Sequence, residues 1–258
     1  MNFQTIEIVI NKKVAYVTLN RPKALNAINL LMMNELDQCF KNIKNNDRIK
    51  VVILQGKGGN FSAGGDIKEM LQLSGEQEFY TVMDRIHSFI MSFYSMPQIT
   101  LVGMDGAVAG LGLSLALTAD YVICSQEVKV AMNFIGIGLV PDGGGHFLLK
   151  EKIGTHKAKQ LIWEGKVMGA SQALQIGIVD EEAEDLAQAI DHQVDVWCSK
   201  PLLAMIRTKK IYTELNRDTL QRTLALEKQA QWEMRQSQDH NEGIQAFVEK
   251  RKAEFNGS

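Results

Sequence analysis

The chain has 258 residues, of which 45% are hydrophobic and 22% are charged, and its formal net charge at pH 7 is −2. This composition is typical of a globular protein, and the small net charge gives no reason to expect a nucleic acid or an anionic membrane as a partner. No apolar run approaches a membrane span, and residues 1–11 lack the basic and apolar segments of a signal peptide. The three cysteines are far apart and odd in number, which disfavours a disulfide framework or a zinc site. We therefore expect a cytoplasmic protein without a metal ion.

Apolar patterning predicts that strands and helices alternate over the first part of the chain, which implies a mostly parallel α/β core. We predict strands at residues 14–20, 51–54, 99–104, 121–124 and 128–132. We predict helices at residues 30–45, 76–96, 146–150, 156–163, 171–175 and 186–199, with Asn29 capping the first of them.

From Pro201 onward the strand signals stop. Residues 217–236 and 244–255 are predicted to be helices, and a capping box formed by Asp239 and Glu242 precedes the second. The apolar stripe of this stretch has to cover a surface, which is either a second subunit or the chain's own core. The pattern divides the chain into an α/β core over residues 1–200 and an all-helical region over residues 201–258.

The stretch 60–70, N-F-S-A-G-G-D-I-K-E-M, joins a predicted buried strand to a predicted helix. Its small residues allow the backbone to turn sharply and to lie close to a ligand. Asp66 and Glu69 have the spacing of a capping box, so free N–H groups would point out of the loop and could hold a negative oxygen. An ordinary capped βα loop explains the same spacing equally well.

A second glycine-rich turn between a strand and a helix occurs at residues 105–120, D-G-A-V-A-G-L-G-L-S-L-A-L-T-A-D. If it meets the first loop, one N–H from each could bind a single carbonyl oxygen, and each such donor contributes about 2.7–4 kcal/mol to a transition state. Two unrelated tight turns are the alternative. A dinucleotide site is disfavoured, because no acidic residue follows about 20 positions later. Ser114 resembles an incomplete nucleophile elbow without an evident base, and a plain helix-face hydroxyl is the simpler interpretation.

The third glycine-rich segment contains the carboxylate that we consider most informative, Asp142, between Pro141 and three glycines. A charged residue at the end of an apolar run is either the N-cap of the next helix or an acid–base group in a pocket. His146, four residues later, is either a structural histidine or a proton shuttle.

Together these segments resemble the crotonase, or enoyl-CoA hydratase/isomerase, superfamily over essentially the whole chain. The matching motifs are N-R-P-K-A-L-N-A at 20–27, F-S-A-G-G-D-I-K-E-M at 61–70, D-G-A-V-A-G-L-G at 105–112, G-L-V-P-D-G-G-G at 138–145 and A-F-V-E-K-R-K at 246–252. The resemblance implies an α/β spiral of ββα units with a C-terminal helical trimerisation region, so residues 201–258 would form an oligomerisation region. It also implies a homotrimer or hexamer and an acyl-CoA thioester substrate, with no separate cofactor because coenzyme A is part of the substrate.

The resemblance further implies which residues form the site. The N–H groups of Gly65 and Leu111 would form an oxyanion hole. Coenzyme A would contact Ala24, Ala63, Asp66 and Ile67, together with Phe247 and Lys250, which in this family typically come from a neighbouring subunit.

Two departures from the family pattern bear on the reaction. Hydratases of the family carry two glutamates that activate water, and Ser114 and Phe134 stand at those positions. The P-D-G-G-G segment is similar to isomerases of the phenylacetate-pathway type, whose catalytic aspartate occupies the Asp142 position; dienoyl-CoA isomerases pair that aspartate with a further carboxylate. We therefore predict an isomerase in which Asp142 is the acid/base, with the apolar Phe134 raising its pKa and excluding water.

Three alternatives are open at this point. The first is a hydratase of relaxed specificity in which Asp142 handles the water, and the second is a catalytically silent acyl-CoA-binding trimer. The third is a serine hydrolase that uses Ser114. The sequence does not identify the acyl group, although residues 71–80 are expected to border its pocket.

Overall fold

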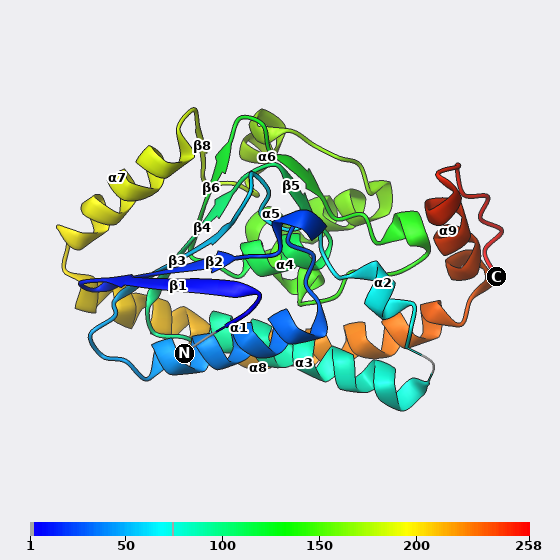
Figure 1. The fold of residues 1–258 in the computed structure, drawn as a ribbon, viewed down its shortest axis with the longest axis horizontal. Coiled ribbons are helices and arrows are strands. Elements are labelled where there is room, and N and C mark those ends of the chain that lie inside the picture. Colours follow the sequence, from blue (N-terminus) through cyan, green and yellow to red (C-terminus); the bar gives the residue numbers. More distant parts are fainter. Residues whose placement is uncertain (1–2, 74) are drawn as a thin grey trace.

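The computed structural model describes residues 3–73 and 75–258 (Figure 1). Within these residues the main sheet has six strands in the order β1-β2-β3-β4-β6-β8. Its strands are β1 (Ile6–Asn11), β2 (Val14–Leu19), β3 (Val51–Gly56), β4 (Ile99–Met104), β6 (Tyr121–Ser125) and β8 (Glu181–Ala183). β1 is antiparallel to β2 and the other neighbouring pairs are parallel, which confirms the predicted mostly parallel core. A separate parallel pair consists of β5 (Ala107–Ala109) and β7 (Lys129–Ala131).

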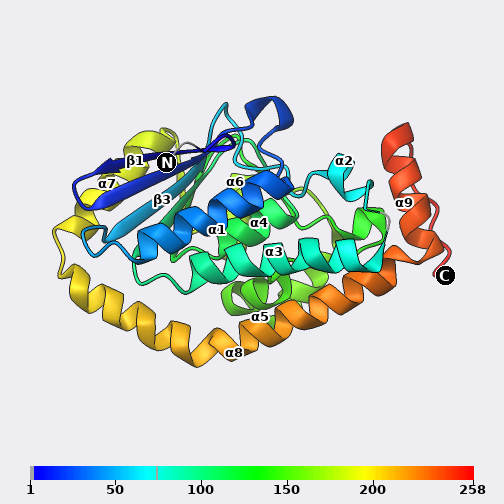
Figure 2. The ribbon, with the colours of Figure 1, turned by 60° about the horizontal axis from the view of Figure 1, so that its bottom comes forward.

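The main sheet is buried on both faces, as alternation along β3 shows. Val52 and Leu54 belong to the larger apolar core, whereas Val51 and Ile53 belong to a second, smaller core on the opposite face. The larger core is covered by helices α1 (Leu30–Lys44), α3 (Glu76–Tyr94), α4 (Leu111–Leu117) and α5 (Gly145–Glu164). The smaller core is covered by α7 (Leu186–Cys198), and Figure 2 shows α7 on the side of the sheet away from α1 and α3.

The remaining elements are short or C-terminal. They are η1 (Pro22–Ala24), α2 (Ile67–Met70), η2 (Ile135–Ile137), α6 (Ala170–Ile176), α8 (Leu202–Arg235) and α9 (Gln238–Glu249). The two helices predicted at 146–150 and 156–163 are the two parts of α5, which Gly154 interrupts with φ 76° and ψ 157°. None of the described helices is long and apolar enough to cross a membrane.

The helix caps separate correct local predictions from wrong ones. Asn29 caps α1 as predicted, because its side chain accepts the N–H of Met32 at 3.0 Å. The predicted capping box at α2 is wrong: Asp66 makes no cap hydrogen bond and pairs with Arg21 at 3.0 Å, while Glu69 accepts the N–H of Leu30 at 2.9 Å. Partners that are distant in sequence have replaced the local ones.

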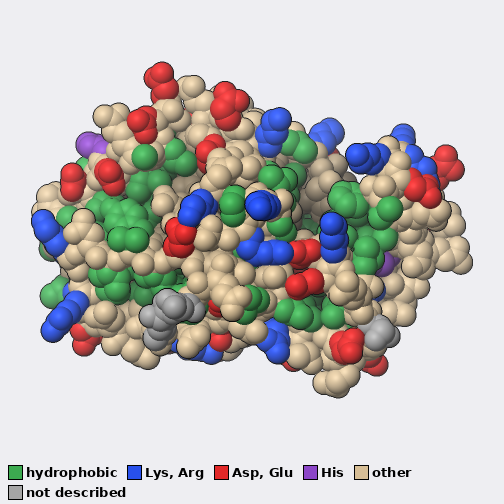
Figure 3. Space-filling view, in the orientation of Figure 1, with side chains coloured by type: hydrophobic (Ala, Val, Ile, Leu, Met, Phe, Trp, Pro, Cys, Tyr) green, Lys and Arg blue, Asp and Glu red, His purple; other side chains and the backbone are tan. Residues whose placement is uncertain are grey.

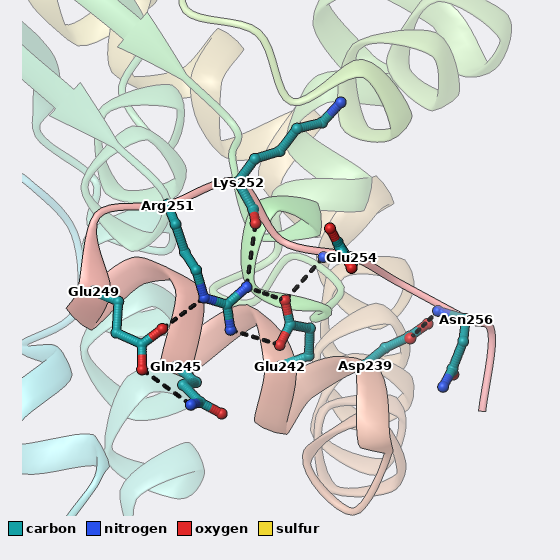
Figure 4. Close-up of polar contacts among 8 residues, drawn as sticks. All are labelled: Asp239, Glu242, Gln245, Glu249, Arg251, Lys252, Glu254 and Asn256. Carbon is teal, nitrogen blue, oxygen red and sulfur yellow. Dashed lines mark hydrogen bonds and ion pairs between the residues drawn. The ribbon is translucent and has the colours of Figure 1, made fainter.

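The second predicted capping box is wrong for the same reason. α9 begins earlier, with Ser237 as its cap, and ends at Glu249. Asp239 instead accepts the N–H of Asn256 at 2.7 Å, and Glu242 forms an ion pair with Arg251 (Figure 4). The carboxylates therefore hold the final segment of the chain against α9.

The C-terminal helices pack on the chain's own core. α8 begins at Leu202 rather than at 217, and it runs along α3 and α5 across the molecule (Figure 2). α9 follows at one end of the molecule and packs on η2. The loop between β7 and α5 thus lies between the α/β core and the C-terminal helices, and this position decides the environment of the site.

Candidate active site

The two glycine-rich loops lie side by side. The N–H of Ser62 donates to Ala107 O at 3.0 Å, and the N–H of Ala109 donates to Ser62 O at 3.0 Å. A methyl group added at Gly112 would lie only 2.7 Å from Ser62 O, so the start of α4 is in direct contact with the first loop. The two loops are therefore one structural unit and not separate turns.

The contact brings the amide of Leu111 next to the first loop. Gly64 has φ +99°, and a methyl group there would lie 2.8 Å from Ala109 O and 3.6 Å from Leu111 N. Leu111 is the first residue of α4, where an N–H has no partner within the helix. Within the described residues, neither the N–H of Gly65 nor that of Leu111 donates to a protein acceptor. Two free donors on adjacent loops can bind one oxygen atom.

The segment that carries Asp142 packs against the same turn of α4. The hydroxyl of Ser114 donates to the backbone carbonyl of Asp142 at 2.7 Å. A methyl group added at Gly143 would lie 2.7 Å from Leu111 Cδ1 and 3.0 Å from Ser114 Cβ. The ring of Phe134 covers the neighbouring turn: a methyl group added at Gly110 would lie 3.5 Å from Phe134 Cζ. These contacts pack Phe134 and the segment that carries Asp142 against Gly110 and the first turn of α4.

The carboxylate of Asp142 is not a helix cap. The N-cap residue of α5 is Gly144, which has no side chain to cap the first turn of this helix. The Asp142 side chain is buried, and its Oδ1 atom has no hydrogen-bond partner among the described residues. Burial, and to a smaller extent the negative charge of Glu227, together raise its pKa from 3.8 to about 8. The N-cap alternative is thereby excluded, and a carboxyl group poised near neutral pH remains.

Sequence analysis missed Glu227, which lies on α8. This residue is 2% exposed, and its Oε2 accepts the N–H of Gly144 at 2.7 Å. Its Oε1 accepts the N–H of His146 at 3.0 Å and lies 2.8 Å from the Nδ1 of the same histidine. The available signal was its position in the apolar stripe of α8, which contains Leu220, Leu224, Glu227 and Gln231.

His146 is a partner of Glu227 and not of Asp142, as the structural interpretation predicted. Ser114 is fully buried, and it donates its hydroxyl proton to a backbone carbonyl. None of the hydrogen bonds of the described histidines reaches it. The serine-hydrolase alternative is therefore disfavoured, because the Ser114 hydroxyl is buried and has no histidine base bonded to it within the described chain.

The residues predicted to contact coenzyme A fall into two groups. Ala24 ends η1, and the N–H of Ala63 donates to Leu25 O at 2.9 Å, so the first group lies together with Asp66 and Ile67 at the first loop. Figure 3 shows Lys and Arg side chains around a hollow on this face, which lies over η1 and α2. Phe247 and Lys250 lie on and directly after α9, which packs mainly on η2 and α8. The single chain does not bring this second group to the first.

An apolar hollow borders the first loop. Its lining includes Met70 and, from the segment 71–80, Leu73; residue 74 of that segment lies outside the described residues, and the expectation that the segment borders the acyl pocket stays a prediction. In the part of the chain that the structure describes, no group of three or more His, Cys, Asp or Glu side chains is arranged to hold a metal ion.

The buried carboxyl group predicts how stability depends on pH. Between pH 4 and pH 8 the folded protein keeps the Asp142 proton and the unfolded chain does not, so raising the pH favours unfolding. Asp142 should lower the free energy of unfolding by about 1.4 kcal/mol per pH unit in this range, and the loss should end above pH 8. The variant Asp142→Asn should lack this slope, so in urea unfolding its stability relative to the natural protein should rise from pH 5 to pH 8. A difference that does not change with pH would contradict this assignment.

Comparison with known proteins agrees with this fold. A crystal structure of an enoyl-CoA hydratase from Mycobacterium avium subsp. paratuberculosis K-10 superposes with a TM-score of 0.88 and 25% identity, covering 99% of this chain and 100% of that chain. The protein thus has the crotonase fold that its motifs predicted.

The family model described as Enoyl-CoA hydratase/isomerase matches residues 9–258. A Bacillus subtilis (strain 168) protein named YhaR, assigned to the enoyl-CoA hydratases/isomerases, is 45% identical over 251 residues, covering 97% of this chain and 98% of that protein. The 1,2-epoxyphenylacetyl-CoA isomerase of Escherichia coli (strain K12) is 30% identical over 263 residues, covering 96% and 97%. The chain belongs to the enoyl-CoA hydratase/isomerase family, which confirms the predicted resemblance.

Proposed function

We propose that this protein is an acyl-CoA isomerase that shifts a double bond, or rearranges an oxepin-like ring, with Asp142 as its single acid/base. The proposal is carried by the buried, unpartnered carboxyl group of Asp142 on a segment that packs against Leu111. Hydratases of the family carry a glutamate at each of two positions that are Ser114 and Phe134 in this chain. These two residues supply no carboxylate, so Asp142 would act alone.

In the proposed reaction the thioester carbonyl oxygen lies between the N–H groups of Gly65 and Leu111. The ionised Asp142 takes a proton from the acyl chain, and the electron pair of the broken C–H bond moves into the thioester to form an enolate. The two N–H groups stabilise the negative oxygen. Asp142 then returns the proton to another carbon, so no water, metal or redox partner is consumed. A pKa of about 8 suits this role, because a general base is most effective when its pKa is near the working pH.

Binding of the coenzyme A moiety would use Ala24, Ala63, Asp66 and Ile67. Because Phe247 is exposed and lies on α9, we propose that it and Lys250 contact coenzyme A bound to a neighbouring copy in a homotrimer or hexamer. The name of the 30%-identical Escherichia coli relative is in line with isomerisation. A silent binding protein is disfavoured, because a buried carboxyl group is costly and binding alone does not need one.

A hydratase is the second candidate, since the superposed Mycobacterium structure carries that name. The experiment that separates the candidates is a screen of enoyl-CoA thioesters, including crotonyl-CoA, in deuterated water with mass-spectrometric detection. An isomerase should incorporate deuterium into the acyl chain and form no 3-hydroxyacyl-CoA. Formation of the 3-hydroxy product at the rate of deuterium uptake would make the protein a hydratase, and binding with neither exchange nor conversion to an isomer would make it a silent binder.

A further inference from the structure

The environment of Asp142 contains a second carboxylate that the proposed reaction does not use. Glu227 reaches from α8 to the start of α5 and takes up two backbone donors, the N–H groups of Gly144 and His146. One turn later on the same helix, the side-chain amide of Gln231 donates to Val140 O. α8 therefore holds the segment 140–146 at both ends, from two positions on one helix face.

One of the two donors that Glu227 occupies, the Gly144 N–H, is the one an aspartate at position 142 would ordinarily use. An Asp side chain commonly accepts the N–H two residues later, and the N-terminal N–H groups of a helix stabilise a nearby negative charge. Gly144 is two residues after Asp142, and it directly precedes α5. Such a bond would stabilise the ionised form of Asp142 and make it a weak base. In the structure, Glu227 has the Gly144 N–H, and Asp142 Oδ1 has no partner in the described chain.

We propose that Glu227 is a positioning residue for Asp142: it withholds the α5 donors from the Asp142 carboxylate and places a negative charge beside it. This inference rests on the proposed function in taking Asp142 as the base. It predicts that Asp142 becomes a weaker base, ionised at lower pH, when the charge of Glu227 is removed. The direction agrees with Glu227 being a cause of the raised pKa of Asp142.

The other titratable groups around this segment do not duplicate Glu227. The titratable side chain that α5 contributes next to Glu227 is His146, which pairs with Glu227. α3 contributes His87, which has a hydrogen bond with the backbone of Leu224. α9 contributes His240, whose Nδ1 lies 2.8 Å from Ile137 O. α4 contributes the Ser114 hydroxyl, already used by the Asp142 carbonyl.

The test compares Glu227→Gln with Glu233→Gln, the same change at an exposed position of the same helix. The readout is the pH dependence of deuterium uptake into the acyl-CoA, with a ¹³C-carboxyl titration of Asp142 assigned from Asp142→Asn. In Glu227→Gln the acidic limb of the rate and the Asp142 titration should both move to lower pH by about one unit or more. The rate above that limb should fall, because the base is weaker. Glu233→Gln should match the natural protein.

Glu227→Met keeps the volume of the side chain and removes the charge without adding a donor, so it serves if Glu227→Gln does not fold. A folded Gln or Met variant that loses activity equally at every pH, with an unmoved Asp142 titration, would overturn the inference and leave Glu227 as a purely structural contact. If Asp142→Asn remains active, the proposed function fails instead. The carboxyl titration still reports the coupling of the two residues in that case, so the two failures are distinguishable.

Discussion

Replacement of Asp142 by asparagine should reduce turnover by about 10²–10⁴-fold, which is the usual contribution of a general acid–base group. Asparagine has nearly the same shape but cannot take a proton from the acyl chain. Binding of the coenzyme A ester should stay nearly intact, because the proposed binding contacts lie at the first loop and not at Asp142. Turnover of the thioester found in the deuterium screen and calorimetric titration with a non-reactive acyl-CoA give the two quantities.

A suitable control for this variant is Asp84→Asn on α3. Asp84 is exposed and pairs with Lys228 at 2.6 Å, so it tests whether loss of any carboxylate near α8 affects turnover. The control should retain full activity. Retained activity in Asp142→Asn would refute the assignment of the base, and a parallel loss of ligand binding would show that Asp142 acts in binding.

Replacement of Leu111 by proline should cost about 10²–10³-fold in turnover, because proline has no N–H to donate to the thioester oxygen. The first position of a helix is where proline is best tolerated, so α4 can still form. The side chain is shortened as well, and Leu111 is buried. Leu111→Ala therefore provides the matched control, since it also truncates the side chain but retains the N–H.

The comparison of the two variants isolates the backbone donor. Leu111→Ala should lose stability through the cavity it creates, by about 2–5 kcal/mol, but should keep most of its turnover once folded. Leu111→Pro should lose a further factor of about 10²–10³ in turnover relative to Leu111→Ala. Its affinity for a non-reactive acyl-CoA should change by less than its turnover. Equal turnover in the two folded variants would remove Leu111 from the oxyanion hole and with it the proposed enolate mechanism.

The order of strands and helices could be predicted because it depends on local patterns. The continuous apolar run of β3 and the three- and four-residue periodicity of α1 and α3 are visible in any short window. Three strands were missed, β1, β5 and β8: β5 and β8 have only three residues each, and β1 is an edge strand with most of its residues exposed. The caps were predictable only where the partner is local, as at Asn29.

The two wrong capping-box predictions share one physical cause, which is a partner outside the local helix turn. Asp66 has the right spacing to cap α2, but Arg21 is a charged partner and lies within 3.0 Å. The ion pair joins two full charges, whereas a cap hydrogen bond joins the carboxylate to a neutral N–H, so the long-range contact determines the side-chain position. The capping box predicted at Asp239 and Glu242 failed in the same way.

The sequence by itself determined the family and singled out the carboxylate proposed as the base, because glycine-rich turns and a Pro-Asp-Gly context are local features of the chain. It also indicated that burial would raise the pKa of Asp142, although it named Phe134 as the neighbour responsible. Only the tertiary structure decided that the two glycine loops are one unit and that Glu227, 85 residues after Asp142, holds the N–H groups beside it. Electrostatic effects depend on distance in space, and folding sets that distance through contacts that no short window of sequence contains.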